Sequence, residues 1–125
     1  MKLLLDTHAA LWLVTGDDKL GPGLHQAIMA AAGAVFVSMA SLWELSIKAN
    51  LGKLRLPAGF RDGLTESGLA LLPITVHHID ALDGMPAHHK DPFDRMLVAQ
   101  AQVEGMTLVS ADRSMRLYDV PVLWS

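Results

Sequence analysis

Residues 2–13 read KLLLDTHAALWL, and this stretch decides what kind of fold the chain adopts. Three consecutive leucines, Leu3 to Leu5, predict a short buried strand, and the apolar residues from Ala9 to Val14 recur at helical spacing. Asp6 lies between the two segments. Its simplest role is that of a helix N-cap, whose carboxylate accepts a backbone N–H and stabilises the helix by about 1 kcal/mol. The stretch therefore predicts a strand that leads directly into a helix.

The same alternation continues along the rest of the chain. Four further apolar runs predict strands at Ala34–Val37, Leu71–Ile74, Thr107–Val109 and Val120–Leu123. Helical spacing marks the segments Leu24–Ala32, Leu42–Leu51, Phe60–Ser67, Ile79–Met85, Phe93–Glu104 and Arg113–Leu117. Nearly continuous apolar strands that alternate with helices indicate a parallel sheet covered on both faces. The predicted fold class is therefore α/β, with NLGKLRLPAGF as its longest loop.

Length and composition favour a single domain, residues 1–125, with its own core. The sequence has 125 residues, of which 51% are hydrophobic, and it contains no cysteine. A chain of this size buries about two-thirds of its unfolded surface without needing disulfides. Because the sequence has no cysteine, disulfides and thiolate metal sites are excluded. Because no apolar run is long enough to span a membrane and the N-terminus lacks a signal-peptide layout, we expect a soluble cytoplasmic protein.

Charge and apolar content limit the partners that the protein can have. The formal net charge of -3 argues against a broad electrostatic footprint for nucleic acid, so any such binding depends on local basic residues or bound cations. The sequence also has three Trp and seven Met. Two readings of this surplus stay open: all of it is core, or another chain covers part of the apolar surface.

Five carboxylates fall near the predicted strand ends, where ligands bind in parallel α/β sheets. They are Asp6, Glu44, Asp91, Asp94 and Asp112. Each also has a structural reading. The stretch SLWE at 41–44 matches a capping box, Asp91 before a proline matches an N-cap, Asp94 suits a first helical turn, and Asp112 suits the cap of the last helix.

Taken together, these acids favour a different interpretation. Parallel strands bring their carboxyl ends to one edge of a sheet, where neighbouring carboxylates repel and raise one another's pKa values. Ser, Thr or Asn would cap the helices about equally well without that repulsion. The acids therefore indicate a bound cation, and ligation by oxygen alone suits Mg²⁺ or Mn²⁺. Such an ion activates a water nucleophile and lets an acidic pocket accept a phosphate backbone.

Four stretches resemble a known family: LLLDTHAALWL, SLWELSIKANLGKLRLP, HHKDPFDRMLVAQAQVEGMTLVSAD and VPVLW. They are similar to PIN-domain ribonucleases, above all to the VapC toxins of VapBC toxin–antitoxin pairs, in the same order and over essentially the whole chain. The resemblance implies a three-layer α/β/α sandwich with a central parallel sheet. It also implies a metal-dependent endoribonuclease that cuts RNA, with tRNA-like molecules as the usual target class. A cognate antitoxin is expected to silence it, and a homodimer is expected as well.

The resemblance further implies roles for particular residues. The family's acidic quartet falls on Asp6, Glu44, Asp94 and Asp112. Asp6 and Asp94 are the expected direct ligands of Mg²⁺ or Mn²⁺, and the other two ligate directly or through water. Asp91 is expected to cap or support the site, and the hydroxyls of Thr7 and Ser110 to orient the carboxylates. No member of the quartet is missing, so nothing marks the enzyme as inactive.

Other polar and aromatic residues receive lesser roles. His88, His89 and Lys90 are expected in a solvated loop. Six basic residues are candidates to bind the RNA backbone, and half of them are expected to be plain surface charges: Lys48, Lys53, Arg55, Arg95, Arg113 and Arg116. Trp12 and Trp43 are expected to pack in the core rather than to stack on bases. No histidine pair has the helical spacing of zinc ligands, so we expect no zinc site.

Two rival interpretations stay open. Enzymes that phosphorylate an Asp also place it after the first strand. However, a dehalogenase-like phosphatase wants a second Asp where this chain has His8, and a receiver domain wants an acid pair and a late Lys that are not evident. The other rival is a catalytically silent PIN-like module that only binds RNA or a protein partner. Cleavage assays with Mg²⁺ and with EDTA separate these interpretations.

Overall fold

The computed structural model describes residues 1–124 and leaves Ser125 outside the described part. The elements follow in the order β1 (Leu3–Leu5), α1 (Thr7–Thr15), η1 (Asp18–Leu20), α2 (Pro22–Ala30), β2 (Val35–Ser38), α3 (Met39–Asn50), α4 (Phe60–Glu66), β3 (Ala70–Leu72), α5 (Val76–Leu82), α6 (Pro92–Glu104), β4 (Thr107–Val109), η2 (Arg113–Leu117) and β5 (Val122–Leu123). The predicted alternation of strands and helices is confirmed. The sequence did not predict η1, and the segment predicted as a last helix is a short 3-10 helix, η2.

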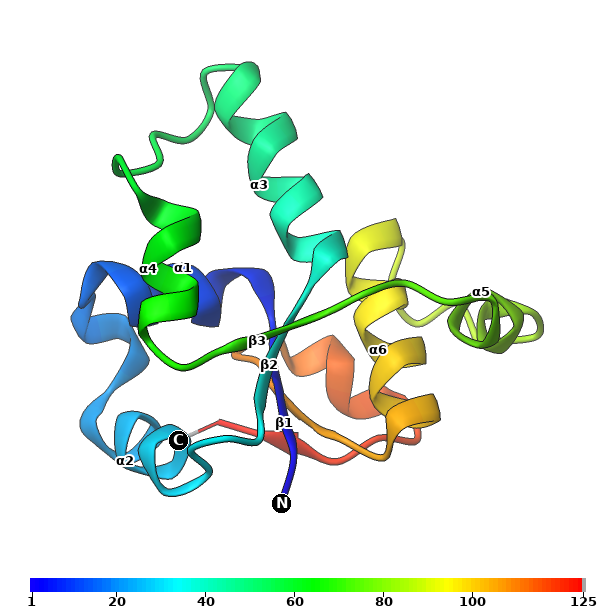
Figure 1. The fold of residues 1–125 in the computed structure, drawn as a ribbon. Coiled ribbons are helices and arrows are strands. Elements are labelled where there is room, and N and C mark those ends of the chain that lie inside the picture. The colour runs from blue at the N-terminus through cyan, green and yellow to red at the C-terminus, as the bar shows by residue number, and fades with distance from the viewer. Residues whose placement is uncertain (125) are drawn as a thin grey trace.

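Five parallel strands form one sheet in the order β3-β2-β1-β4-β5 (Figure 1). The central strand is β1, where Leu5 pairs with Val37 of β2 on one side and with Val109 of β4 on the other. All three leucines of β1 are fully buried. Because the strands are parallel, the carboxyl ends of β1, β2 and β4 lie side by side at one edge.

Successive side chains of β1 point into two separate cores, because residues alternate between the faces of a sheet. Leu3 and Leu5 belong to a core that includes apolar residues of α1, α2 and α4. Leu4 belongs to a second core that includes residues of α6 and η2. Figure 1 shows α1, α2 and α4 on one side of the sheet and α6 on the other. The predicted three-layer α/β/α sandwich is confirmed.

Three acids cap helices as the sequence predicted. Asp6 caps α1, Asp91 caps α6 and Asp112 caps η2, and each carboxylate accepts at least one backbone N–H of the helix that follows it. Each cap satisfies a donor that a helix cannot pair internally. The caps therefore fix the acids at the starts of their helices.

The start of α3 differs from the prediction. It begins at Met39 because Ser38, the last residue of β2, supplies the cap by accepting the Ala40 N–H at 3.0 Å. Ser41 therefore lies inside the helix, and the predicted capping box of Ser41 and Glu44 is wrong. The Glu44 side chain is left to make other contacts.

The connection from α3 to α4 contains the longest loop that was predicted, and residues 51–59 hold neither helix nor strand. Before this loop, α3 extends away from the sheet (Figure 1). Among residues 1–124, no helix is long and apolar enough to cross a membrane.

Candidate metal centre

A small cavity at the carboxyl edge of the sheet brings the five predicted acids together. It has a volume of about 110 Å³ and is lined by Asp6, Thr7, His8, Glu44, Lys48, Asp91, Asp94 and Asp112. The first and last of these residues follow the neighbouring strands β1 and β4, and the Asp6 N–H donates to the Val109 carbonyl at 2.9 Å. The remaining acids come from α3 and from the start of α6. The sheet topology therefore gathers the acids, whereas their roles stay predictions.

Asp6 acts as both a helix cap and a buried carboxylate. Its side chain is almost inaccessible, and its Oδ1 accepts the Ala9 N–H at 2.8 Å. Burial raises the pKa of Asp6 above its ordinary value, although hydrogen bonds from Ser110 and Ala9 partly offset this effect. Ser110 is thus placed against Asp6, and its Oγ also accepts the Asp112 N–H at 3.1 Å. A nearby cation would favour the ionised form of Asp6.

Glu44 is buried, and both of its oxygens have partners. Oε1 accepts the Thr7 hydroxyl at 2.7 Å, and Oε2 accepts from Lys48 Nζ at 2.8 Å. Thr7 also makes a 3.0 Å hydrogen bond to the hydroxyl of Ser41. The hydrogen bond to Glu44 raises the pKa of Lys48. These contacts hold one positive charge at the wall of the cavity.

Asp94 lies one turn into α6 and faces several negative charges. Burial and then the neighbouring Asp91 raise its pKa to about 7, with further contributions from Glu44 and Asp6, while His89 opposes the rise. Asp94 Oδ2 lies 3.1 Å from the Nε2 of His89. Within residues 1–124, Oδ1 has no hydrogen-bond partner, so this oxygen is available to a ligand.

Asp112 is the acid whose charge is best compensated. Its Oδ1 accepts both the N–H and the hydroxyl of Ser114, at 2.9 and 2.7 Å, and its Oδ2 lies 2.8 Å from His89 Nε2. Burial alone would raise the pKa of Asp112, but these hydrogen bonds outweigh it and lower the pKa. Asp112 is therefore ionised and fixed in orientation.

The prediction of a solvated loop is wrong for His89, although it holds for the exposed His88 and Lys90. The His89 ring is largely buried and contacts both Asp94 and Asp112. The sequence signal was weak, because two adjacent histidines before DPFD show nothing of a contact with an acid 23 residues further on.

The remaining sequence predictions have mixed outcomes. Trp12 packs against the core of α1 and α2, as predicted. Trp43 is 62% exposed and contacts Phe93 edge-on, so its predicted core position is wrong. Arg95 donates to the carbonyls of Pro86 and Met85, at 2.9 and 3.4 Å, and thus holds a loop. The basic residue that lines the acidic cavity is Lys48.

The donor set of this cavity fits a hard divalent cation. Its ligand atoms are carboxylate oxygens, and the sequence has no cysteine. Repulsion between neighbouring acids contributes to the raised pKa values of Asp6 and Asp94, and a cation between the acids would relieve it. Asp94 offers a free oxygen. The cavity is therefore a candidate site for Mg²⁺ or Mn²⁺.

The fold and the acidic cavity define a class of α/β/α proteins with a carboxylate cluster at the carboxyl edge of a parallel sheet. The sequence profile of the PIN domain matches residues 3–121. Because this match spans almost the whole chain, the protein belongs to the PIN-domain family.

Solved structures share this fold. VapBC2 from Rickettsia felis, bound to a DNA fragment from their promoter, has a TM-score of 0.75 and 13% identity, covering 98% of this chain and 98% of that chain. DNA-bound VapBC from Salmonella typhimurium has a TM-score of 0.72 and 15% identity, over 98% and 97% of the two chains. FitAcB from Neisseria gonorrhoeae has a TM-score of 0.63 and 17% identity, over 98% and 96%. A comparison with curated proteins found no match.

Proposed function

We propose that the protein is a metal-dependent endoribonuclease of the VapC toxin type, which cleaves RNA phosphodiester bonds. The observation that carries the proposal is the single cavity lined by five acids, in which the pKa of Asp94 is raised to about 7. Membership of the PIN-domain family supports it, because members of this family are generally nucleases. The similar structures include two VapBC complexes and a toxin–antitoxin complex from Klebsiella pneumoniae, which supports the toxin type.

In this proposal, Asp6 and Asp94 bind Mg²⁺ or Mn²⁺, and Glu44 and Asp112 complete the set directly or through water. The bound ion supplies an activated water and positive charge for the phosphate group. The other residues orient these groups. Thr7 and Ser110 hold carboxylates by their hydroxyls, and Asp91 caps α6 so that its first turn presents Asp94 to the cavity. Lys48, whose Nζ donates to Glu44 at the wall of the cavity, is the basic residue proposed to contact the phosphate backbone.

The experiment compares cleavage of single-stranded RNA and of a structured tRNA in Mg²⁺, Mn²⁺ and EDTA. We expect cleavage with either ion, none in EDTA, and none by Asp94→Asn. The matched control is Asp80→Asn, which removes an equally charged but exposed acid of α5. An acyl phosphate serves as a third substrate, and its turnover in place of RNA would point to phosphotransfer.

The competing function is a silent PIN-like module that binds RNA without cutting it. Equal RNA binding by the wild type and by Asp94→Asn, with no cleavage under any metal, would favour this module. The intact set of acids argues against it, because a binding module has no use for carboxylates that repel phosphate.

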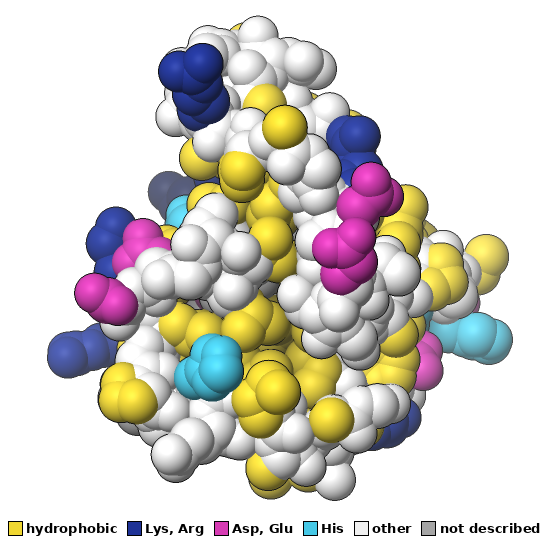
Figure 2. Space-filling model, turned by 60° about the vertical axis from the view of Figure 1, so that its left-hand side comes forward, with side chains coloured by type: hydrophobic (Ala, Val, Ile, Leu, Met, Phe, Trp, Pro, Cys, Tyr) yellow, Lys and Arg dark blue, Asp and Glu magenta, His cyan; other side chains and the backbone are white. Residues whose placement is uncertain are grey.

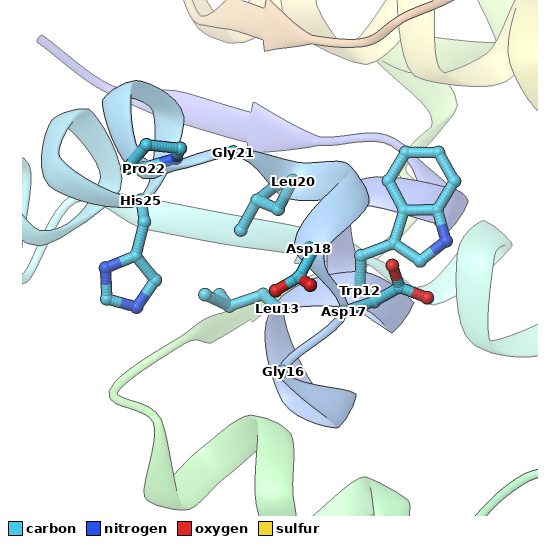
Figure 3. Close-up of a pocket in the computed structure, with 9 residues that line it drawn as sticks. All are labelled: Trp12, Leu13, Gly16, Asp17, Asp18, Leu20, Gly21, Pro22 and His25. Atoms are coloured by element: carbon cyan, nitrogen blue, oxygen red, sulfur yellow. The ribbon is translucent and has the colours of Figure 1, made fainter.

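We also propose that a cognate antitoxin covers an apolar hollow on the face that carries α1, α2 and α4. Figure 2 shows hydrophobic side chains gathered in the centre of this face. Two adjoining pockets of about 450 and 350 Å³ share Leu13 and His25. Figure 3 shows the first of them, whose lining combines the acids Asp17 and Asp18 with the apolar Leu13 and Leu20. An apolar segment with basic side chains fits this lining.

The antitoxin is proposed to insert a basic side chain, an Arg, among the acids, where it replaces the charge of the metal and blocks RNA. Co-expression with the product of the adjacent gene tests this idea, and we expect the two proteins to purify together. High-level expression of this chain alone, without toxicity and as a monomer, would contradict it.

A homodimer is proposed from a second exposed apolar feature. Met39, Trp43 and Ile47 recur every fourth residue on α3, and Leu51 continues the row just after the helix. We call these four residues the α3 stripe. Residues at this spacing share one side of a helix, and Trp43 and Leu51 are 62% and 63% exposed. The α3 stripe therefore offers a second copy a continuous apolar surface.

A further inference from the structure

His89 holds two of the four quartet acids at once. Its ring Nε2 lies 2.8 Å from Asp112 Oδ2 and 3.1 Å from Asp94 Oδ2. Asp94 lies in the first turn of α6 and Asp112 follows β4, so the ring lies between acids that come from different elements. His89 itself is not among the residues that line the acidic cavity.

The hydrogen bond at the other ring nitrogen, Nδ1, shows which nitrogen of His89 carries the proton. Nδ1 accepts the backbone N–H of Asp91 at 3.0 Å, so it carries no proton in the neutral ring. The single proton of the neutral ring is therefore on Nε2, which donates to Asp112 and lies 3.1 Å from Asp94 Oδ2. A protonated Nε2 has no lone pair for a metal ion. His89, Asp94 and Asp112 have ligand-type atoms within 4.8 Å of one another, yet His89 acts there as a donor.

The backbone around His89 is fixed by a third element. The His89 N–H donates to the Tyr118 hydroxyl at 2.9 Å, and the Arg95 guanidinium contacts the same hydroxyl at 3.3 Å. Arg95 also donates to the carbonyl of Pro86 at 2.9 Å. The loop before α6 is therefore tied down on both sides of His89, which fixes the backbone from which the ring projects.

We propose that His89 is a positioning residue of the metal centre, whose Nε2–H sets the spacing of Asp94 and Asp112 from outside the cavity. The inference rests on the proposed function, because it assumes that these acids serve a bound cation. Hydrogen-bond partners of ligating carboxylates fix their orientation, and losing one typically weakens metal binding or activity by roughly 10–100-fold. Without His89, Asp94 would keep its repulsive neighbours and lose the ring that opposes them at 3.1 Å.

Two substitutions distinguish the acceptor role of Nδ1 from the donor role of Nε2. His89→Asn keeps a short side-chain acceptor for the Asp91 N–H, as Asn commonly does two residues before its partner, but it removes the donor to the acids. His89→Gln is longer and brings an amide N–H to the position of Nε2. The matched control is His88→Asn, because His88 precedes it in the same loop and contacts the ring of Tyr118 edge-on at 5.1 Å.

The measurement is the dissociation constant of Mn²⁺, obtained by calorimetry on the full chain without RNA, with circular dichroism as a check of folding. We expect roughly 10–100-fold weaker binding for His89→Asn, near-wild-type binding for His89→Gln and no change for His88→Asn. Wild-type affinity in His89→Asn would overturn the proposal. Equal losses in both His89 variants would overturn it as well.

Electron paramagnetic resonance of bound Mn²⁺ tests the opposite assignment. A positioning residue gives no hyperfine coupling from a directly bound imidazole nitrogen, whereas a ligand does, so such coupling would overturn the proposal. RNA cleavage is measured separately. If Mn²⁺ binding follows the expected order but neither the wild type nor any variant cuts RNA, the proposed function fails and the role of His89 in metal binding stands. If the wild type binds no Mn²⁺, the role of His89 fails.

Discussion

Asp94 carries an electrostatic cost that depends on pH. Its folded pKa is about 7, against an ordinary value of 3.8. A carboxylate with a raised folded pKa does not affect stability below its unfolded pKa. As pH rises from about 4 to about 7, ionisation of Asp94 progressively lowers the free energy of unfolding, and the full loss is present above that range. Metal-free protein is therefore expected to lose stability over this interval.

Replacing Asp94 by Asn removes that cost. In EDTA, we expect Asp94→Asn to be more stable than the wild type at pH 8 by roughly 1–3 kcal/mol, and to differ little at pH 4. Urea denaturation at both pH values measures this. Asp80→Asn, at an exposed acid, is expected to show no such pH dependence. An Asp94→Asn variant that is less stable than the wild type at pH 8 would contradict the burial and repulsion seen at this residue.

Asp6 combines a cap with a proposed ligand, and two substitutions separate these roles. Asn caps about as well as Asp, whereas Ala removes the acceptor of the Ala9 N–H and costs about 1 kcal/mol. We expect Asp6→Asn and Asp6→Ala both to abolish RNA cleavage, and only Asp6→Ala to lose the free energy of the cap. Cleavage assays and urea denaturation in EDTA provide the two readouts. RNA cleavage by Asp6→Asn would show that Asp6 is a cap alone.

At the scale of single residues, the sequence predicted that the acids gather at one edge but not which side chains contact them. Asp6 and Asp112 could be placed because each follows an apolar strand, and parallel strands end at a common edge. His89 and Trp43 could not. The His89 contacts depend on how the loop before α6 folds back toward Asp112, and the exposure of Trp43 depends on α3 extending beyond the sheet. Neither is a property of local spacing.

Among the elements, existence and type were easier to predict than boundaries. The helix starts of α1, α3 and α5 all lie before the first residues that apolar spacing had suggested. The reason is that polar cap residues begin these helices: Asp6, Ser38 and Thr75 each accept a backbone N–H of the first turn. Apolar periodicity reports the buried face of a helix and does not identify the residue that caps its first turn.

The contact between α5 and α6 depends on a buried histidine. His78 is fully buried; its Nδ1 accepts the Thr75 N–H at 3.0 Å, so Nε2 donates to Glu104 at 2.7 Å. We expect Glu104→Ala to cost about 1–3 kcal/mol, because it leaves a buried N–H unpaired. Glu104→Gln retains an acceptor and is expected to cost less. Urea denaturation checks both, and equal losses would show that the hydrogen bond is not the cause.

At the scale of the whole molecule, the α3 stripe predicts self-association. We expect the chain to sediment as a dimer, and the double variant Ile47→Lys with Leu51→Lys to sediment as a monomer, because two buried positive charges oppose pairing. Met29→Lys on α2 is the control, since Met29 is also exposed but lies outside the stripe. A wild-type monomer, or a double variant that stays dimeric, would contradict this use of the stripe.

Metal binding at the acidic cavity is expected to stabilise the whole fold. At a concentration ten times the dissociation constant, an ion that binds only the folded state adds about 1.4 kcal/mol. Thermal melts in millimolar Mg²⁺ or Mn²⁺ measure this as a rise in Tm over the EDTA sample. The Asp94→Asn variant is expected to show a smaller rise. Equal rises in both proteins would place the ion elsewhere.

The sequence indicated the parallel sheet but not the order of its strands. Pairing between Leu3 and Thr107 joins residues that are far apart in the chain, and no local pattern encodes such a partner. The acids depend on this pairing, because β1 and β4 must be neighbours before Asp6 and Asp112 can meet.

That strand order also sets when the protein becomes complete during translation. A ribosome synthesises β1 first, yet one side of β1 stays open until residues 107–109 have left the exit tunnel. Asp6 therefore lacks its neighbour Asp112 during most of the chain's synthesis. If the acidic cavity cuts RNA as proposed, a nascent chain has no finished cutting centre until the messenger that encodes it has been translated past residue 112.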